Sequence, residues 1–290
     1  MENEILNINR DILFKDVSLK NLNTMRLDGV VKYLIKPTSF IELKEVIKIL
    51  DKYEVKYNII GNGSNVLFTN KEKECLIKLD FKKNKDLGII NANELLMIKA
   101  YEFFNNGYKG FEYISNIPAS VGGAILMNAG AYNHFFSDII EYVYYLDEDY
   151  KFKVIRKEDC SFAYRNSLFK NNKFIILGCK VKLIKENKSV LKNIMDDCNK
   201  KRKDSQPTYF PNSGSIFKNN NSICAWKLID SVKLRGVKRN GASISEKHCN
   251  FIVNENNASF NDVIYLINLI KKEVKRKFDI DLEEEVIIID

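Results

Sequence analysis

The segment that most constrains the fold is residues 117–132, an uncharged run of small and apolar residues that reads IPASVGGAILMNAGAY. A surface loop of this length would carry polar side chains. A long helix would not hold Gly122 and Gly123 in its interior, where each glycine costs about 1 kcal/mol relative to alanine. Glycine permits positive φ and the close approach of another group to the backbone. The run therefore predicts a backbone that packs closely against either a neighbouring strand or a flat cofactor.

The length and composition limit the class of protein. A chain of 290 residues can bury a sizeable core and allows about two domains. Its hydrophobic content of 45% and charged content of 29% are ordinary for a soluble globular protein. The amino terminus lacks the basic and then apolar order of a secretory signal, and no apolar stretch reaches the roughly 20 residues of a membrane helix. We therefore expect a cytoplasmic protein with no membrane partner.

Cysteine, histidine and charge argue against a metal site and a nucleic-acid partner. The six cysteines are widely separated and form no C-x-x-C pair, which disfavours a zinc site or a disulfide framework and predicts buried, reduced thiols. With two histidines in the chain, we expect no metal site. The net charge of +8 would suit a nucleic acid, but the lysines form no stripe, and abundant Lys, Asn and Ile are typical of an AT-rich coding sequence. The positive charge also suits a small anionic substrate.

Hydrophobic periodicity predicts an α+β chain. Ser39 and Glu42 form a capping box ahead of one apolar helix face, and Ser259 with Asp262 marks the start of the clearest helix. The expected elements are a helix at 40–53, a strand at 57–60, a helix at 93–106, a hairpin of strands at 139–146 and 152–155, a strand at 174–184, a linker at 185–188, a helix at 189–202, a helix from 259, and a closing strand at 282–289.

A glycine turn at 61–65, with the sequence GNGSN, follows the strand at 57–60. Consecutive backbone N–H groups in such a turn can hold a pyrophosphate. Val66 stands where the third glycine of G-x-G-x-x-G would be, and a plain tight turn is the better explanation of the segment when it is taken alone. A flavin dinucleotide needs both a phosphate-binding turn and a flat, closely packed ring site, so the turn and the run 117–132 together favour that cofactor.

Three other motifs each allow a structural and a functional interpretation. Residues 164–167 place the scarce Arg165 beside an aromatic ring, either as a surface ion pair or as an anion ligand. Residues 211–219 combine a Ser-Gly-Ser turn with a lysine and an asparagine, as a loop entering a strand or as a binding loop. Residues 282–286 hold three glutamates, as a solvated acidic edge or as part of a site.

Taken together and in order, these motifs resemble the UDP-N-acetylenolpyruvoylglucosamine reductase family, in its compact type, over nearly the whole chain. This family belongs to the FAD-binding PCMH or vanillyl-alcohol-oxidase-like superfamily. The segments that carry the resemblance are 23–26, 61–65, 117–132, 164–167, 214–219, 245–251 and 282–286.

The resemblance implies an α+β fold and a division of the chain by role. An FAD-binding PCMH-type region is expected at 1–186, in two α/β subdomains of about 1–78 and 79–186. A substrate-binding α+β domain is expected at 187–290, with its terminal strand at 282–290 packing back towards the flavin site.

The implied activity is the FAD-dependent, NADPH-using reduction of UDP-N-acetylglucosamine enolpyruvate to UDP-N-acetylmuramate. This reaction belongs to peptidoglycan precursor synthesis, and through it to cell wall biogenesis, cell shape, cell division and the cell cycle. The implied partners are the UDP-sugar and NADPH, with neither nucleic acid nor membrane, and the protein is expected to be a monomer. NADPH would reduce the flavin and leave, and hydride would then add to the terminal enol carbon.

The motif match assigns three catalytic residues. Arg165 would stabilise the charge that builds beside the substrate carboxylate, because its planar fork suits a carboxylate. Ser215 matches the proton donor, which works only when it is positioned against a strongly basic carbanion. Glu285 matches the third member, which would stabilise or orient the enol-like intermediate.

The remaining site predictions also follow from the resemblance. The predicted cofactor-binding residues are Gly61, Asn62, Gly63, Ser64, Asn65, Pro118, Ala119, Ser120, Gly122, Gly123, Ala129 and Gly130. The predicted substrate-binding residues are Tyr164, Lys218 and Asn219.

The chain departs from the family pattern at five positions. Asn220 replaces a usual proline, Ser205 a common lysine and Ser243 a long polar residue, while Lys233 and Asn240 replace glycines. These departures concern nucleotide binding rather than the three catalytic matches. Two alternatives remain open, namely a flavin oxidase of the same cofactor fold with another substrate, and a basic binding protein without catalysis.

Overall fold

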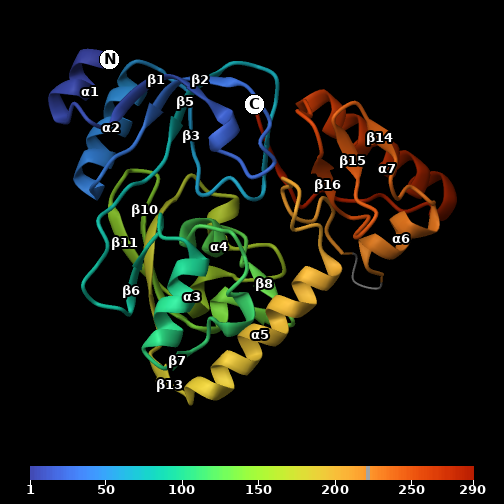
Figure 1. Cartoon of the computed structure of the whole chain (residues 1–290). Helices are drawn as coiled ribbons and strands as arrows, with labels where there is room; N and C mark the ends of the chain where they lie inside the picture. The colour runs from blue at the N-terminus through green and yellow to red at the C-terminus, as the bar shows by residue number, and fades with distance from the viewer. Residues whose placement is uncertain (220–222) are drawn as a thin grey trace. The chain divides into compact units, whose positions relative to one another are not determined.

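The computed structural model describes residues 1–219 and 223–290 and confirms the expected α+β class. The chain forms two compact units (Figure 1). The N-terminal unit comprises Met1–Lys15, Tyr33–Asn62 and Glu74–Lys200, and the C-terminal unit comprises Asp16–Lys32, Gly63–Lys73 and Lys201–Asp290. These units differ from the expected division at 186, because two early segments pair with the end of the chain. The cause is long-range backbone pairing, described below.

A first sheet has the strand order β1-β2-β5-β3. Its strands are β1 (Leu13–Ser18), β2 (Val30–Ile35), β3 (Tyr57–Ile59) and β5 (Lys73–Ile77), with helices α1 (Glu2–Ile8) and α2 (Phe40–Lys52). The apolar face of α2 is buried in one core with residues of these strands. Ser39 caps α2 by accepting from the Glu42 N–H at 3.2 Å, as expected. The Glu42 carboxylate accepts instead from the backbone N–H and the hydroxyl of Thr38, so the capping box is only half formed.

A second sheet has the order β11-β10-β12-β6. Its strands are β6 (Ile89–Asn91), β10 (Ile140–Leu146), β11 (Phe152–Arg156) and β12 (Ile175–Val181). β10 and β11 form the expected antiparallel hairpin. Helices α3 (Leu96–Asn105) and α4 (Val121–Leu126) share a buried core with this sheet. The run 117–132 therefore contains a single short helix, α4, and the residues before and after it in the run are not helical.

Short pairs and single turns complete the N-terminal unit. The pairs are β7 (Tyr108–Lys109) with β13 (Ile184–Lys185), and β8 (Gly130–Ala131) with β9 (His134–Phe135). The N-terminal unit has 3-10 turns at Glu112–Ile114, Phe136–Asp138, Lys157–Cys160 and Leu168–Lys170, and a further 3-10 turn, Leu19–Asn21, lies in the C-terminal unit. The expected linker at 185–188 is wrong, because Lys185 belongs to β13 and Lys188 begins helix α5 (Lys188–Ser205).

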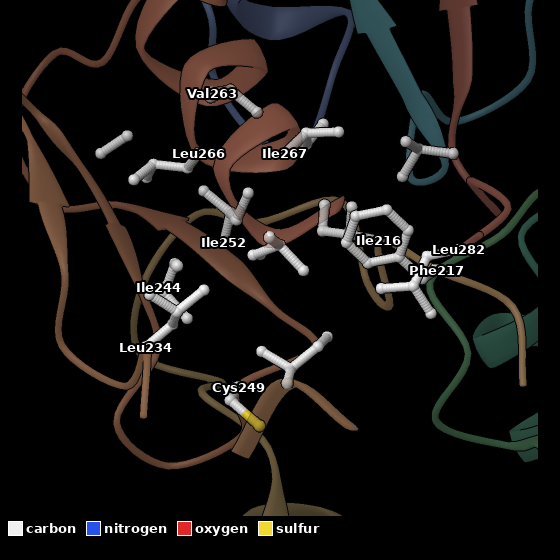
Figure 2. Close-up of a cluster of buried hydrophobic side chains, with 14 of the residues drawn as sticks. Ile216, Phe217, Leu234, Ile244, Cys249, Ile252, Val263, Leu266, Ile267 and Leu282 are labelled. Atoms are coloured by element: carbon white, nitrogen blue, oxygen red, sulfur yellow. The ribbon is translucent and has the colours of Figure 1, made fainter. Parts of the chain in front are cut away.

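The C-terminal unit packs one long helix on a small antiparallel sheet. Its elements are α6 (Ala225–Ser231), β14 (Lys238–Arg239), β15 (Ala242–Ile244), β16 (Ile252–Asn254) and α7 (Phe260–Phe278). Figure 2 shows Val263, Leu266 and Ile267 of α7 facing the side chains of the sheet and of the loops around it. Ser259 and Asp262 mark the expected start of α7 and form a capping box there.

The end of the chain returns to an early segment of the same unit. β17 (Ile287–Ile289) pairs in parallel with β4 (Val66–Phe68), and Asn254 Nδ2 donates to the Met25 carbonyl at 2.9 Å. The closing strand is shorter than expected, because residues 283–285 pair with the segment around Phe217 instead. Of the helices within residues 1–219 and 223–290, none has the length and apolarity needed to cross a membrane.

Candidate functional site

A cavity of about 340 Å³ lies in the N-terminal unit where two parallel strands end. Gly61 follows β3, and Lys78 follows β5, the strand paired with it. Ligands in open α/β sheets bind at such carboxyl ends. The lining residues are Ile59, Ile60, Gly61, Asn62, Lys78, Leu79, Asp80, Ala92, Asn93, Leu95, Ser120, Gly122, Gly123, Leu126, Phe174, Ile175 and Ile176. The structure thus brings together five of the predicted cofactor-binding residues, from both the glycine turn and the run 117–132.

The sequence left open whether the small residues of 117–132 pack against other chain or against a cofactor, and the glycines of this wall differ in this respect. A Cβ on Gly61 would lie 2.1 Å from Ser120 Oγ, and a Cβ on Gly122 would lie 3.0 Å from Ala92 Cβ. These two glycines therefore permit close packing of chain on chain. A Cβ on Gly123 would meet Ser120 Oγ at 3.3 Å and, apart from its chain neighbours and the backbone of its own helix, no other described atom within 4 Å. Gly123 therefore leaves the cavity wall without a side chain.

The cavity fits part of a flat, anionic dinucleotide such as FAD. Its volume is near the lower end of ligand pockets, which span about 300–1,000 Å³, so it would hold part of an extended cofactor. Its walls combine bare glycine backbone with apolar side chains. Asn93 Oδ1 is buried and has no hydrogen-bond partner within residues 1–219 and 223–290. Burial lowers the pKa of the Lys78 ammonium, which is half-buried beside this wall.

Sequence reasoning missed Lys78, Asn93 and Leu95 as lining residues. Each follows a strand whose end opens on the cavity, Lys78 after β5 and the other two after β6. The strand ends were the available signal, but it becomes useful only when the pairing of the strands is known.

Arg165 lies in a tight turn whose two ends bond to each other. The Ala163 N–H donates to the Asn166 carbonyl at 3.1 Å, and the Asn166 N–H donates to the Ala163 carbonyl at 3.2 Å. Arg165 has φ of 53°, in the left-handed region, and its guanidinium lies 5.0 Å from the centre of the Tyr164 ring. Strained conformations of this kind cluster at functional sites, which favours the functional interpretation of the motif.

Ser215 and Glu285 are brought together within the C-terminal unit, although 69 positions separate them in the sequence. The Glu285 N–H donates to the carbonyl of Ile216 at 2.7 Å, and the Lys218 N–H donates to the carbonyl of Glu283 at 2.9 Å. Ile216 and Phe217 are buried beside Leu282 (Figure 2). The core therefore fixes the segment that carries Ser215 and Lys218 against the segment that carries Glu285.

The three glutamates of this segment differ in their contacts. Glu283 forms an ion pair with Lys218, and Glu284 forms one with Lys271 at 2.7 Å. The backbone of Glu285 is held on both sides, because its carbonyl also accepts from Asn65 Nδ2 at 3.0 Å. Asn65, predicted to bind cofactor, thus joins the glycine turn to the Glu285 segment.

Thr24 links two further motifs in the C-terminal unit. Its N–H donates to the Gly63 carbonyl at 3.1 Å, and its hydroxyl donates to the Asn212 carbonyl at 2.7 Å. Gly63 has φ of 67°, and a Cβ there would lie 2.0 Å from the Leu22 carbonyl oxygen. The second glycine of the turn is therefore required by chain packing.

Other predicted residues lie outside the cavity lining and support the chain. The Pro118 carbonyl accepts from Nδ2 of the lining residue Asn62 at 2.7 Å, and the Ala119 carbonyl accepts from the Leu96 N–H at 2.9 Å. The Ala129 carbonyl accepts from the Phe136 N–H at 2.8 Å. Gly63, Ser64, Asn65, Pro118, Ala119, Ala129 and Gly130 are the predicted cofactor residues outside this lining. Their roles stay predictions.

Asn219, a predicted substrate residue, has a structural contact. Its Oδ1 accepts from the Ala225 N–H at 3.1 Å, where α6 begins. This bond satisfies one of the N–H groups that a helix leaves without an internal partner.

The departures from the family pattern have local contacts. Lys233 has φ of 56° and Asn240 has φ of 44°, which is the left-handed region where glycine is usual. The Ser243 hydroxyl donates to Glu255 at 2.7 Å, and the Ser205 hydroxyl donates to the Lys201 carbonyl at 2.7 Å. Asn220 lies outside the described residues.

Comparison with known proteins agrees with these features. Residues 206–289 match the model of the UDP-N-acetylenolpyruvoylglucosamine reductase C-terminal domain, and residues 31–152 match that of an FAD binding domain. The reductase of Carboxydothermus hydrogenoformans is 40% identical over 270 residues, which cover 91% of this chain and 89% of that protein. The reductase of Clostridioides difficile is 35% identical over 98% of this chain and 96% of that protein.

A solved structure gives the same result for the fold. The crystal structure of UDP-N-acetylenolpyruvylglucosamine reductase from Thermus caldophilus matches with a TM-score of 0.84 and 31% identity. The match covers 96% of this chain and 100% of that chain. The resemblance inferred from the motifs is therefore confirmed, and the chain belongs to the UDP-N-acetylenolpyruvoylglucosamine reductase family, flavoprotein oxidoreductases of peptidoglycan synthesis.

Proposed function

We propose that this protein reduces UDP-N-acetylglucosamine enolpyruvate to UDP-N-acetylmuramate, with NADPH as reductant and FAD as bound cofactor. The observation that carries the proposal is the pairing of the Ser215 and Glu285 segments through the Glu285 N–H and the Ile216 carbonyl. A flavin enzyme for another substrate would have no need of both residues, which lie far apart in the sequence. The family membership and the names of the relatives support the same substrate.

The proposal assigns a task to each catalytic residue. When bound, FAD supplies the hydride that adds to the terminal enol carbon. Arg165 holds the substrate carboxylate with its guanidinium fork and stabilises the negative charge that develops next to it. The Ser215 hydroxyl gives its proton to the carbon beside the carboxylate and recovers a proton from water. Glu285 orients the enol-like group of the substrate.

The binding residues follow the same division. Gly61, Asn62, Ser120, Gly122 and Gly123 would hold FAD through backbone groups and by leaving its space open. Tyr164, Lys218 and Asn219 would contact the substrate. The FAD-binding role of the region before residue 187, the substrate-binding role of the region after it, a cytoplasmic location and a monomeric state are parts of this proposal.

A half-reaction experiment on Ser215→Ala tests the proposal. Without the hydroxyl, reduction of the flavin by NADPH should stay near normal, while its reoxidation by the enolpyruvyl substrate should slow by orders of magnitude. Ser231→Ala is the control, because its hydroxyl donates to the Lys227 carbonyl within α6. Equal slowing of both half-reactions in Ser215→Ala would exclude Ser215 as the proton donor. A colourless purified protein that takes up no FAD would refute the flavin enzyme altogether.

A further inference from the structure

The turn that carries Arg165 needs support from its surroundings. An L-residue is disfavoured in the left-handed region, yet Arg165 adopts φ of 53°. Such conformations persist only where neighbouring groups fix them. The two backbone bonds between Ala163 and Asn166 close the turn, but they do not attach it to the rest of the unit.

Asn128 supplies one attachment from the run 117–132. Its Nδ2 donates to the Ala163 carbonyl at 3.2 Å, and its Oδ1 accepts from the Ser137 N–H at 3.3 Å. Asn128 is buried, and its backbone has φ of 42°, a conformation that asparagine tolerates. One amide thus joins the entry of the Arg165 turn to the segment after α4.

Ser167 supplies the second attachment on the other side of the turn. Its hydroxyl donates to the Leu126 carbonyl at 2.8 Å, and the residue is buried. Leu126 is the last residue of α4 and lines the cavity described above. Lys170 Nζ adds a bond to the carbonyl of Arg165 itself, at 3.3 Å.

From these contacts we propose that Asn128 and Ser167 are positioning residues, which hold the strained Arg165 turn against α4 and the cavity wall. The cofactor wall and the arginine then move as one body. This inference rests on the proposed function, in which Arg165 meets the substrate carboxylate. A misplacement of about 1 Å can slow a reaction about 100-fold, so the loss of one attachment should slow the substrate half-reaction by roughly tenfold.

The first test compares Ser167→Ala with Ser115→Ala in the full-length holoenzyme. Both hydroxyls are buried and donate to a backbone carbonyl at 2.8 Å, Ser167 to Leu126 and Ser115 to Glu112. Both variants should lose similar stability. We expect Ser167→Ala alone to reoxidise reduced flavin roughly tenfold more slowly with UDP-N-acetylglucosamine enolpyruvate, while its reduction by NADPH and its affinity for FAD match those of Ser115→Ala.

The second test compares Asn128→Gly with Asn133→Gly. Both asparagines have positive φ, 42° and 62°, which glycine adopts freely, so each variant removes a side chain without new backbone strain. Asn133 is exposed and serves as the control. Asn128→Gly should show the slow reoxidation, and Asn133→Gly should behave as the parent protein does.

The outcomes separate this inference from the proposed function. If the parent protein is reoxidised by the substrate but Ser167→Ala and Asn128→Gly match their controls, the positioning role is wrong and the proposed function stands. If slowing affects reduction by NADPH equally, the two residues act on general stability and the inference also fails. If the parent protein itself is not reoxidised, the proposed function fails first.

Discussion

At the cavity wall, an added methyl group would affect the cofactor space at one glycine and the packing of the fold at another. A methyl group on Gly123 lies 3.3 Å from Ser120 Oγ and otherwise faces open space, whereas one on Gly61 would overlap that oxygen at 2.1 Å. Ser120 is also the cap of α4, because its Oγ accepts from the Gly123 N–H at 3.2 Å. The two glycines therefore give opposite expectations for the same substitution.

Gly123→Ala should leave the fold intact and lower the affinity for FAD. We expect the free energy of unfolding of the flavin-free protein to change by less than about 1 kcal/mol, because alanine is at most about 1 kcal/mol more favourable than glycine in a helix. The dissociation constant of FAD, measured by fluorescence titration, should rise about tenfold. Gly61→Ala should instead destabilise the flavin-free protein by about 1–3 kcal/mol, as overpacking does. Unchanged FAD affinity in Gly123→Ala would place the cofactor elsewhere.

Arg165→Lys tests the planar fork. A lysine keeps the charge but not the bidentate geometry, so reoxidation of the flavin by substrate should slow by about 100-fold, with reduction by NADPH unaffected. Arg276→Lys is the control, since Arg276 is exposed and pairs with Glu273 on the surface of α7. Near-normal turnover of Arg165→Lys would contradict the role of Arg165 as the carboxylate ligand.

Three catalytic roles could be proposed from the sequence because the segments around Arg165, Ser215 and Glu285 match the family pattern. The local features, a scarce arginine beside an aromatic ring and a Ser-Gly-Ser turn, left structural and functional interpretations open when taken alone. The choice of Glu285 among three adjacent glutamates came from the family pattern. No local feature showed that Glu283 and Glu284 pair with lysines. The contacts of Asn128 and Ser167 could not be predicted, because their partners are backbone groups, which any residue supplies.

At the scale of elements, the cap of α7 couples stability to pH. Burial alone would raise the pKa of Asp262, but hydrogen bonds from the Ser259 N–H, the Ser259 hydroxyl and Asn240 outweigh it, and the pKa lies below its usual value. A depressed carboxyl pKa stabilises the fold above the ordinary Asp value, about 3.9, and this contribution is lost as the pH falls through the folded pKa.

Asp262→Asn should therefore lower the free energy of unfolding by about 1 kcal/mol at neutral pH. The difference from the parent protein should shrink as the pH falls below about 4, because Asp262 then becomes protonated and is neutral, as the asparagine is at every pH. Chemical denaturation at several pH values measures this. Asp281→Asn is the control, because Asp281 is exposed and forms a surface ion pair with Lys275. A difference that persists at low pH would show that the charge of Asp262 is not responsible.

Helices were predictable where both signals were local. α2 and α7 each carry a serine cap and an apolar face, and both were found near their expected limits. The helix expected at 93–106 begins at Leu96 instead, because Leu95 pairs with Ser120. The closing strand was too long because its partners, β4 and the Phe217 segment, lie far away in the sequence.

At the scale of the whole molecule, the sequence could not predict that each unit is built from separate segments of the chain. The C-terminal unit takes in Asp16–Lys32 and Gly63–Lys73, and the pairing of β17 with β4 joins residues more than two hundred positions apart. Composition and periodicity describe short windows, so they carry no information on such pairing. The family pattern gave the order of the motifs but not their contacts.

The thiols give a test of packing across both units. In the part of the chain that the structure describes, no disulfide joins the six cysteines, and five of them are buried. Burial raises the pKa of the Cys75 thiol and of the Cys160 thiol to about 12 each, so neither forms a thiolate at neutral pH. We expect an aromatic disulfide reagent to label only Cys224 rapidly in the native protein, and all six cysteines after unfolding. Cys224→Ser should abolish the rapid phase, and two or more rapid thiols would contradict the packing.

The most direct test of the central claim is a single anaerobic turnover. The full-length protein with its FAD is reduced by one equivalent of NADPH, separated from NADP, and mixed with UDP-N-acetylglucosamine enolpyruvate. We predict that the flavin absorbance returns completely and that one equivalent of UDP-N-acetylmuramate forms, whereas UDP-N-acetylglucosamine, which lacks the enolpyruvyl group, leaves the flavin reduced. Flavin that stays reduced in the presence of the enolpyruvyl substrate would contradict the account.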